Sequence, residues 1–90
     1  MMSKWNVYMV RCCDGSLYTG IATDVPSRIA KHNDGKASKY TRSKLPVELV
    51  YCEPVSSHGD ALRREYAIKQ LPPKIKRELL GSAMNRLHTH

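Results

Sequence analysis

The sequence predicts a small α/β protein of the α+β type, in which helices pack on a three-stranded antiparallel sheet. Three runs are rich in β-branched and aromatic residues and end at turn residues, as strands do: residues 5–12, 17–23 and 47–52. Two stretches have apolar residues at helical spacing, one directly after the second run and one at residues 60–71. A chain of 90 residues is long enough for one thin core. The expected order is therefore β-β-α-β-α-α in a single domain.

The first two strands are expected to form a hairpin, and its loop length decides which side chains share a face. A two-residue turn at Asp14 and Gly15 would place Tyr8 and Tyr18 on opposite faces, because side chains alternate along a strand. A three-residue loop with a left-handed Gly15 would pair Tyr8 with Gly20 and bring both tyrosine hydroxyls to one face. We expect that arrangement, with the Tyr8 ring over Gly20. Two such tyrosines could also be packing residues with hydrated hydroxyls.

The first helix is expected to begin at Thr23 or Asp24, since either residue can cap its N-terminus, and to end at Gly35. Proline 26 suits the first turn, where the backbone N–H is not needed. Val25 and Ile29, four residues apart, predict the face that turns inward.

The C-terminal third is expected to hold two further helices. A proline pair ends the first of them, and residues 74–80 are predicted to form one or two amphipathic turns. Residues 82–90 are polar, and we expect them to fray. The domain is accordingly expected to span residues 1–82, followed by a polar tail at 83–90.

The charge is strongly unbalanced, with 15 Lys and Arg against 8 Asp and Glu and a net charge of +7. This excess favours a polyanionic partner, either nucleic acid or an anionic membrane surface. Residues 36–44 concentrate basic side chains around Tyr40, although such a segment could also be a solvated loop. No apolar run approaches the roughly 18 residues of a membrane span, and the first residues lack the pattern of a signal peptide. Three cysteines without a paired framework indicate reduced thiols, so we expect a cytoplasmic protein.

Two further features do not fit an ordinary core or surface. Arg28 and His32 share one helix face and could present a cation and an imidazole to a phosphate, although a solvated polar face would explain them equally. Glu65 falls where the apolar stripe of its helix would continue, which is costly unless a cation meets the carboxylate. That cation could be a divalent metal ion, which favours oxygen ligands, or a neighbouring side chain. The available side chains are Arg63, Arg64 and Lys69.

Taken in order, these residues resemble the GIY-YIG nucleases. The two short motifs of that family are matched by Asn6-Val7-Tyr8, which lacks the glycine, and by Tyr18-Thr19-Gly20. The family's arginine and histidine are matched by Arg28 and His32, and its metal-binding glutamate by Glu65. Many members carry an asparagine about a dozen residues later, where this chain has Arg77.

The flanking sequences are similar to the small stand-alone bacterial members, and the match runs from Trp5 to about Leu80. They are Asp14-Gly15-Ser16-Leu17 before the second motif, then Lys39-Tyr40-Thr41-Arg42, Pro46-Val47-Glu48-Leu49-Val50-Tyr51 and Ala61-Leu62-Arg63-Arg64-Glu65.

The resemblance implies a metal-dependent endonuclease that hydrolyses phosphodiester bonds, in DNA more than in RNA, with a role in repair or recombination. Glu65 would hold Mg²⁺ or Mn²⁺, Tyr8 would be the general base aided by Tyr18, and Arg28 would stabilise the developing charge. His32 would either relay the proton of Tyr8 or be the base itself. The nucleic-acid backbone would be held by Lys39, Tyr40, Arg42 and Lys44.

Two other functions are compatible with the same residues. One is a nucleic-acid-binding module that keeps the fold with little or no turnover, and the other is an adaptor recruited by a larger repair protein. No membrane partner is expected.

Overall fold

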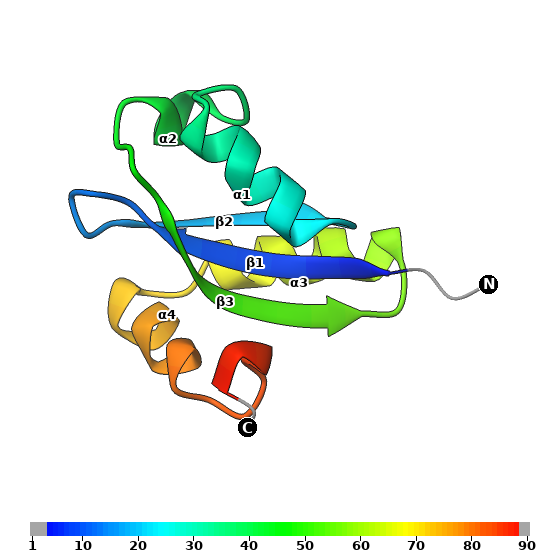
Figure 1. Ribbon diagram of the computed structural model, residues 1–90. Helices are drawn as coiled ribbons and strands as arrows, with labels where there is room; N and C mark the ends of the chain where they lie inside the picture. Colours follow the sequence, from blue (N-terminus) through cyan, green and yellow to red (C-terminus); the bar gives the residue numbers. More distant parts are fainter. Residues whose placement is uncertain (1–3, 89–90) are drawn as a thin grey trace.

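A computed structural model describes residues 4–88 of the chain, and its element order agrees with the predicted fold class. The elements are β1 (Trp5–Arg11), β2 (Leu17–Ala22), α1 (Val25–Asn33), α2 (Lys39–Arg42), β3 (Glu48–Val55), α3 (His58–Lys69), α4 (Pro73–Leu80) and the 3-10 helix η1 (Arg86–His88). The short helix α2, within the basic segment, is an addition to the predicted order. Figure 1 shows these elements along the chain.

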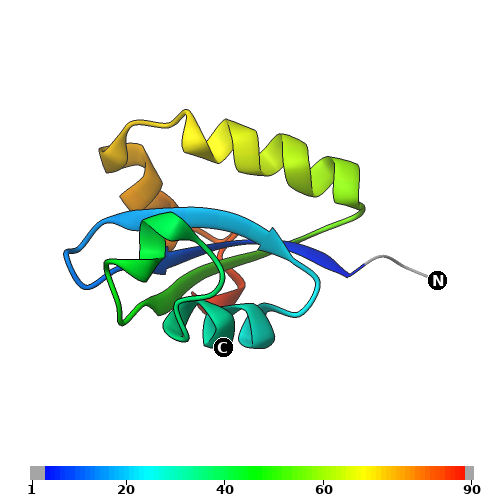
Figure 2. The same cartoon turned by 90° about the horizontal axis from the view of Figure 1, so that it is seen from above.

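The three strands form one antiparallel sheet in the order β2-β1-β3, so β1 is the central strand. Helix α1 lies on one face of this sheet and helix α3 on the other (Figures 1 and 2). The sheet is therefore covered on both faces, and each face of β1 packs against a different helix.

The hairpin has the three-residue loop predicted above. Gly15 has a φ of +87°, and its N–H donates to the carbonyl of Cys12 over 2.9 Å. Tyr8 is consequently paired with Gly20, and Val10 with Tyr18. The prediction that both tyrosines lie on one face is confirmed, because paired residues share a face.

Helix α1 begins and ends as expected. The Asp24 carboxylate caps it by accepting the N–H of Ser27 over 3.1 Å, and Gly35 follows its end with a φ of +76°. Two residues of α1, Val25 and His32, are buried.

Two apolar clusters flank the sheet. On the α1 face, the buried members include Tyr8, Val10 and Val25. On the α3 face, the cluster is formed by buried Val7, Met9, Tyr51, Ala61 and Ile68. Adjacent residues of β1 thus enter different clusters, as the alternation of side chains along a strand requires.

The predicted fraying of the chain from residue 82 onward is wrong for the residues that the structure describes. Asn85 is only 1% exposed, and its amide group binds the edge strand β3. Its Oδ1 accepts the N–H of Cys52 over 3.1 Å, and its Nδ2 donates to the carbonyls of Val50 and Leu80, each over 2.9 Å. One side chain therefore satisfies backbone groups that β3 would otherwise leave open. Residues 89 and 90 lie outside the described residues.

The remaining differences concern the bounds of elements. Strand β3 continues to Val55, three residues beyond its predicted end, because it pairs with β1 along that length. Helix α3 begins at His58, since the hydroxyl of Ser57 caps it by accepting the N–H of Asp60.

Candidate functional site

A chain of buried hydrogen bonds links β1 to α1 and α2. The Tyr8 hydroxyl lies 2.8 Å from His32 Nε2, and His32 Nδ1 lies 2.8 Å from Thr41 Oγ1. Thr41 Oγ1 also lies 3.4 Å from the carbonyl of Ser38, to which it donates. Tyr8, His32 and Thr41, which form this hydrogen-bond chain, are each at most 1% exposed. The sequence pointed to Tyr8 and His32, whereas Thr41 was not singled out, because its nine-residue separation from His32 has no sequence signal.

Gly20 allows the Tyr8 ring to take this position. A Cβ on Gly20 would lie 2.5 Å from the Tyr8 hydroxyl oxygen and 2.7 Å from Cζ. Only glycine permits such an approach, because real Cβ atoms do not come that close to other heavy atoms. Glycine at position 20 of β2 is therefore a packing requirement of the Tyr8 ring.

Tyr18 lies beside this chain and connects it to the basic segment. Its ring meets the His32 ring edge-on at 5.3 Å between centroids and stacks on Tyr40 at 5.8 Å. Lys44 Nζ lies over the Tyr40 ring at 4.0 Å and pairs with Asp14 at 3.2 Å. Tyr40 itself remains 43% exposed. An exposed aromatic face thus borders the buried hydrogen-bond chain.

Charges around Tyr8 act in opposite directions. Burial raises the pKa of Tyr8 to about 12; the neighbouring Tyr18 and the Glu65 carboxylate add to that rise, and the Arg28 guanidinium opposes it. Burial, with the Arg28 charge, lowers the pKa of His32 below its usual value. Both side chains of the pair are therefore neutral at pH 7. The five predicted residues, Tyr8, Tyr18, Arg28, His32 and Glu65, are brought into one neighbourhood.

Glu65 lies on α3 and has a side-chain partner. Its Oε2 lies 3.2 Å from Lys69 Nζ, one helical turn further on, and its side chain is 20% exposed. The same Lys69 Nζ lies 5.9 Å from the centre of the Tyr18 ring. The Glu65–Lys69 ion pair of α3 therefore lies near Tyr18. Of the three basic residues near Glu65 in the sequence, Lys69 is the one that forms an ion pair with it. The four-residue spacing was the signal that favours this choice.

The other basic residues of the segment differ in their contacts. Lys39 and Arg42 of α2 are exposed, and neither has an ion-pair partner within residues 4–88. Lys44 is partly buried by Tyr40 and Asp14, and these two groups raise its pKa. Lys39 and Arg42 are therefore available to a ligand, and Lys44 fixes the position of the Tyr40 ring.

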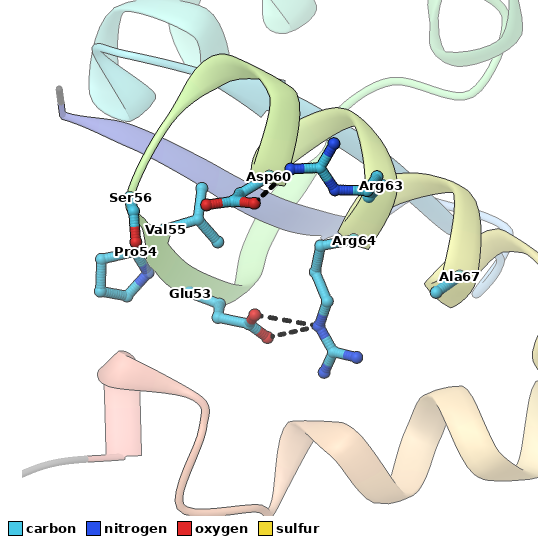
Figure 3. Close-up of a pocket in the computed structure, with 8 residues that line it drawn as sticks. All are labelled: Glu53, Pro54, Val55, Ser56, Asp60, Arg63, Arg64 and Ala67. Atoms are coloured by element: carbon cyan, nitrogen blue, oxygen red, sulfur yellow. Dashed lines mark hydrogen bonds and ion pairs between the residues drawn. The ribbon is translucent and has the colours of Figure 1, made fainter.

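A hollow of about 490 Å³ lies away from this site, between the end of β3 and α3 (Figure 3). Its charged side chains pair with one another. Arg64 Nε lies 3.1 and 2.9 Å from the two carboxylate oxygens of Glu53, which also accepts the Tyr51 hydroxyl, and Arg63 pairs with Asp60. Each charge already has an opposite charge beside it, so the hollow offers little to a charged ligand.

The fold is that of a known domain family. The family model described as the GIY-YIG catalytic domain matches residues 4–77. The family consists of nucleases, which bind nucleic acid and generally use a divalent metal ion.

The similar proteins narrow this assignment. A UPF0213 protein of Desulfotalea psychrophila is 53% identical over 80 residues, covering 88% of this chain and 73% of that protein. A UPF0213 protein of Staphylococcus epidermidis is 57% identical over 68 residues, covering 76% and 83%. The chain therefore belongs to the GIY-YIG family and, within it, to the small bacterial UPF0213 proteins.

Solved structures agree with this assignment. The solution NMR structure of the UPF0213 protein from Bacillus halodurans is 40% identical with a TM-score of 0.59, covering 93% of this chain and 89% of that one. A protein of E. faecalis is 31% identical with a TM-score of 0.60, covering 97% and 94%. Within residues 4–88, no helix is long and apolar enough to cross a membrane.

Proposed function

We propose that the protein is a metal-dependent endonuclease that hydrolyses phosphodiester bonds, in DNA more than in RNA. The observation that carries this proposal is the buried chain from Tyr8 through His32 to Thr41, beside Tyr18, Arg28 and Glu65. A chain of this kind can accept a proton from a nucleophilic water at a distance from solvent. The nuclease family of the domain and the net charge of +7 support the same substrate class.

The direction of the proton path follows from the partners of each group. Thr41 donates its hydroxyl proton to the carbonyl of Ser38, so its oxygen accepts from Nδ1–H of His32. His32 Nε2 is then the acceptor for the Tyr8 hydroxyl proton. With a pKa of about 12, Tyr8 is protonated at neutral pH and cannot be the base alone. The water passes its proton to the Tyr8 oxygen while Tyr8 passes its own to His32, which is the final acceptor.

Arg28 and Tyr18 assist this transfer. The Arg28 guanidinium favours negative charge on the Tyr8 oxygen and can donate to the phosphoryl oxygens, where charge builds during the reaction. Tyr18, on the same face as Tyr8, aligns the water between the two hydroxyls.

Glu65 is the residue that would hold the metal ion. In the described part of the chain, no group of three or more His, Cys, Asp or Glu side chains is positioned to hold a metal ion. A single carboxylate fits Mg²⁺ or Mn²⁺, because such ions keep several waters and take further oxygens from substrate phosphates. Bound at Glu65, the ion would polarise a phosphate oxygen and stabilise the departing alkoxide. Lys69 has to release the carboxylate first, and it then lies free to meet a phosphate.

The nucleic acid is held by the segment around α2. Lys39 and Arg42 contact backbone phosphates, and the exposed face of Tyr40 supports a sugar or base. Lys44 acts by holding Tyr40, since Asp14 already takes part of its charge.

The test compares wild-type protein with Glu65→Gln on branched, flapped, single-stranded and duplex DNA, and on RNA. Each substrate is incubated with Mg²⁺, with Mn²⁺ and with chelator. We expect cleavage that requires the cation and is lost in Glu65→Gln, while nucleic-acid binding and the melting temperature stay close to wild type. Equal cleavage by Glu65→Gln would contradict the assignment of the metal ligand.

A second candidate function is a nucleic-acid-binding adaptor with little turnover, which a larger repair protein would recruit in the cytoplasm. The specific observation is that Lys69 neutralises Glu65 and that Tyr8 has a raised pKa, both of which oppose chemistry in the free protein. Binding to branched or single-stranded DNA without any cation-dependent product, at all metal concentrations, would favour the adaptor over the nuclease.

A further inference from the structure

A second basic feature lies between the start of β2 and the start of α4. It is a groove of about 220 Å³ lined by Ser16, Leu17, Pro73, Lys76 and Arg77. Both views of the molecule place the β1–β2 hairpin and the beginning of α4 at the same end (Figures 1 and 2). None of the roles proposed above uses these residues.

The groove carries uncompensated positive charge. Within residues 4–88, neither Lys76 nor Arg77 has a carboxylate at ion-pair distance. The acidic residues that belong to the same end of the sheet are already neutralised. Glu48 pairs with Arg11 at 3.3 Å, and Asp14 pairs with Lys44 at 3.2 Å. Two cations therefore face a recess without a counter-charge, which is typical of an anion site.

The walls of the groove are held in place by their own contacts. The Asp14 carboxylate accepts the Ser16 N–H over 3.0 Å and the Ser16 hydroxyl over 2.6 Å. Leu17 of β2 and Leu79 and Leu80 of α4 pack against the same buried apolar cluster, and α4 contacts β3. The recess is thus formed before a ligand arrives, and binding would not require its ordering.

The groove shares the edge strand β2 with the candidate active site but lies on the other side of the sheet, since Leu17 packs in the α3-side cluster and Tyr18 in the α1-side cluster. Leu17, in its wall, directly precedes Tyr18, and the linker that enters α4 follows directly after Lys69, the partner of Glu65. The anion that a nucleic-acid strand would offer at this edge of the sheet is a backbone phosphate.

We propose that Lys76 and Arg77 bind a backbone phosphate of the nucleic acid, on the side of the active site opposite to α2. The inference rests on the proposed function for its ligand class. Arg77 can engage two phosphate oxygens at once, and Lys76 adds a point charge.

The test measures binding of a fluorescent single-stranded DNA to the full chain in chelator, by anisotropy at several salt concentrations. The variants are Lys76→Ala and Arg77→Ala. The matched control is Lys74→Ala, which removes the same charge from an exposed position of α4 outside the groove. We expect about tenfold weaker binding for each groove variant, because each loses a hydrogen bond to a charged group. The salt dependence should fall by about 0.7 log units per log unit of salt for each lost contact.

Two comparisons decide the outcome. Arg77→Lys should restore the salt dependence but only part of the affinity, since the charge returns without the second hydrogen bond. If the groove variants bind with the same affinity and salt dependence as Lys74→Ala, the proposal is overturned. It is also overturned if inorganic phosphate shifts the Ser16 and Leu17 amide signals while DNA binding ignores both variants, because the groove would then hold a small anion only.

The assay separates this inference from the nuclease proposal. Groove-dependent DNA binding without cation-dependent cleavage would support the phosphate site and reject the nuclease. Cation-dependent cleavage, with an unchanged salt dependence of DNA binding in the groove variants, would support the nuclease and reject the phosphate site. The same titrations with RNA of equal length show whether the contact distinguishes the two polymers; equal losses on both support a phosphate contact.

Discussion

The two faces of β1 are equally buried but differ in kind. Val7 and Met9 enter an apolar cluster under α3, whereas Tyr8 enters a hydrogen-bond chain that runs to His32 under α1. Apolar burial contributes stability at roughly 25 cal/mol per Å², whereas a satisfied buried hydrogen bond contributes only about 0.5–1.5 kcal/mol net of its desolvation. The α3 face of β1 is therefore mainly an apolar core, whereas the α1 face also holds the buried hydrogen-bond chain of Tyr8, His32 and Thr41.

The buried polar groups of the α1 face are tolerated because each has a partner. Within the described residues, no buried side-chain nitrogen or oxygen lacks a hydrogen bond. The α3 face contains polar groups of its own, among them the Glu53 carboxylate, which accepts hydrogen bonds from the Tyr51 hydroxyl and from Arg64 Nε. The difference between the faces is thus that the α1 face holds a chain of three hydrogen-bonded side chains, which the proposed mechanism uses for proton transfer.

The largest effect should come from Tyr8→Phe, which removes the first member of the chain and keeps the ring. We expect the cleavage rate at saturating DNA to fall by about 10²–10⁴-fold, the range for loss of a general base. Stability should change by only about 1–3 kcal/mol, since one buried nitrogen of His32 loses its partner. Single-turnover cleavage and urea unfolding measure the two quantities. Full cleavage by this variant would show that the proton leaves by another route.

Substitution of the next residue, Met9→Ala, should lower stability and leave the cleavage rate unchanged. Met9 is 0% exposed on the α3 face, and truncation there should cost about 2–5 kcal/mol of the free energy of unfolding. Below its melting temperature, the folded variant should cleave at the wild-type rate, because Met9 is none of the residues of the proposed site. A rate loss as large as that of Tyr8→Phe in fully folded Met9→Ala would mean that the two faces are not independent.

The smallest effect should be a pH dependence of stability from His32. Burial lowers the pKa of His32 in the folded protein below the ordinary value of 6.5, so at mildly acidic pH the unfolded chain binds more protons than the folded one. The free energy of unfolding should then be highest above pH 6.5 and fall as the pH drops from there toward the folded-state pKa. Cleavage should fall in the same window, because protonated Nε2 cannot accept the Tyr8 proton.

Urea unfolding at pH 7.5 and pH 5.5 checks this dependence. His32→Gln should lose part of the difference between the two pH values, whereas His58→Gln, at an exposed position of α3, should keep it. An unchanged difference in His32→Gln would assign the acid sensitivity to other groups.

The sequence by itself determined the features that depend on short separations along the chain. The loop of residues 13–15 decided the parity of the hairpin, and Asp24 and Gly35 decided the ends of α1, because turn geometry and caps involve only neighbouring residues. Tyr8 and Tyr18 could therefore be placed on one face in advance. The choice of Arg28, His32 and Glu65 rested on helical spacing and on the resemblance to a family.

Only the tertiary structure decided which groups meet across the layers. The pairing of His32 with Thr41, the packing of Asn85 on β3 and the groove at Lys76 and Arg77 join segments whose contact no local pattern encodes. The pKa of Tyr8 belongs to the same class, since it depends on burial and on charges from α1 and α3. Local chemistry sets turns, caps and periodicity, whereas proton transfer and ion binding depend on distances of a few ångströms, which exist only once the helices have packed on the sheet.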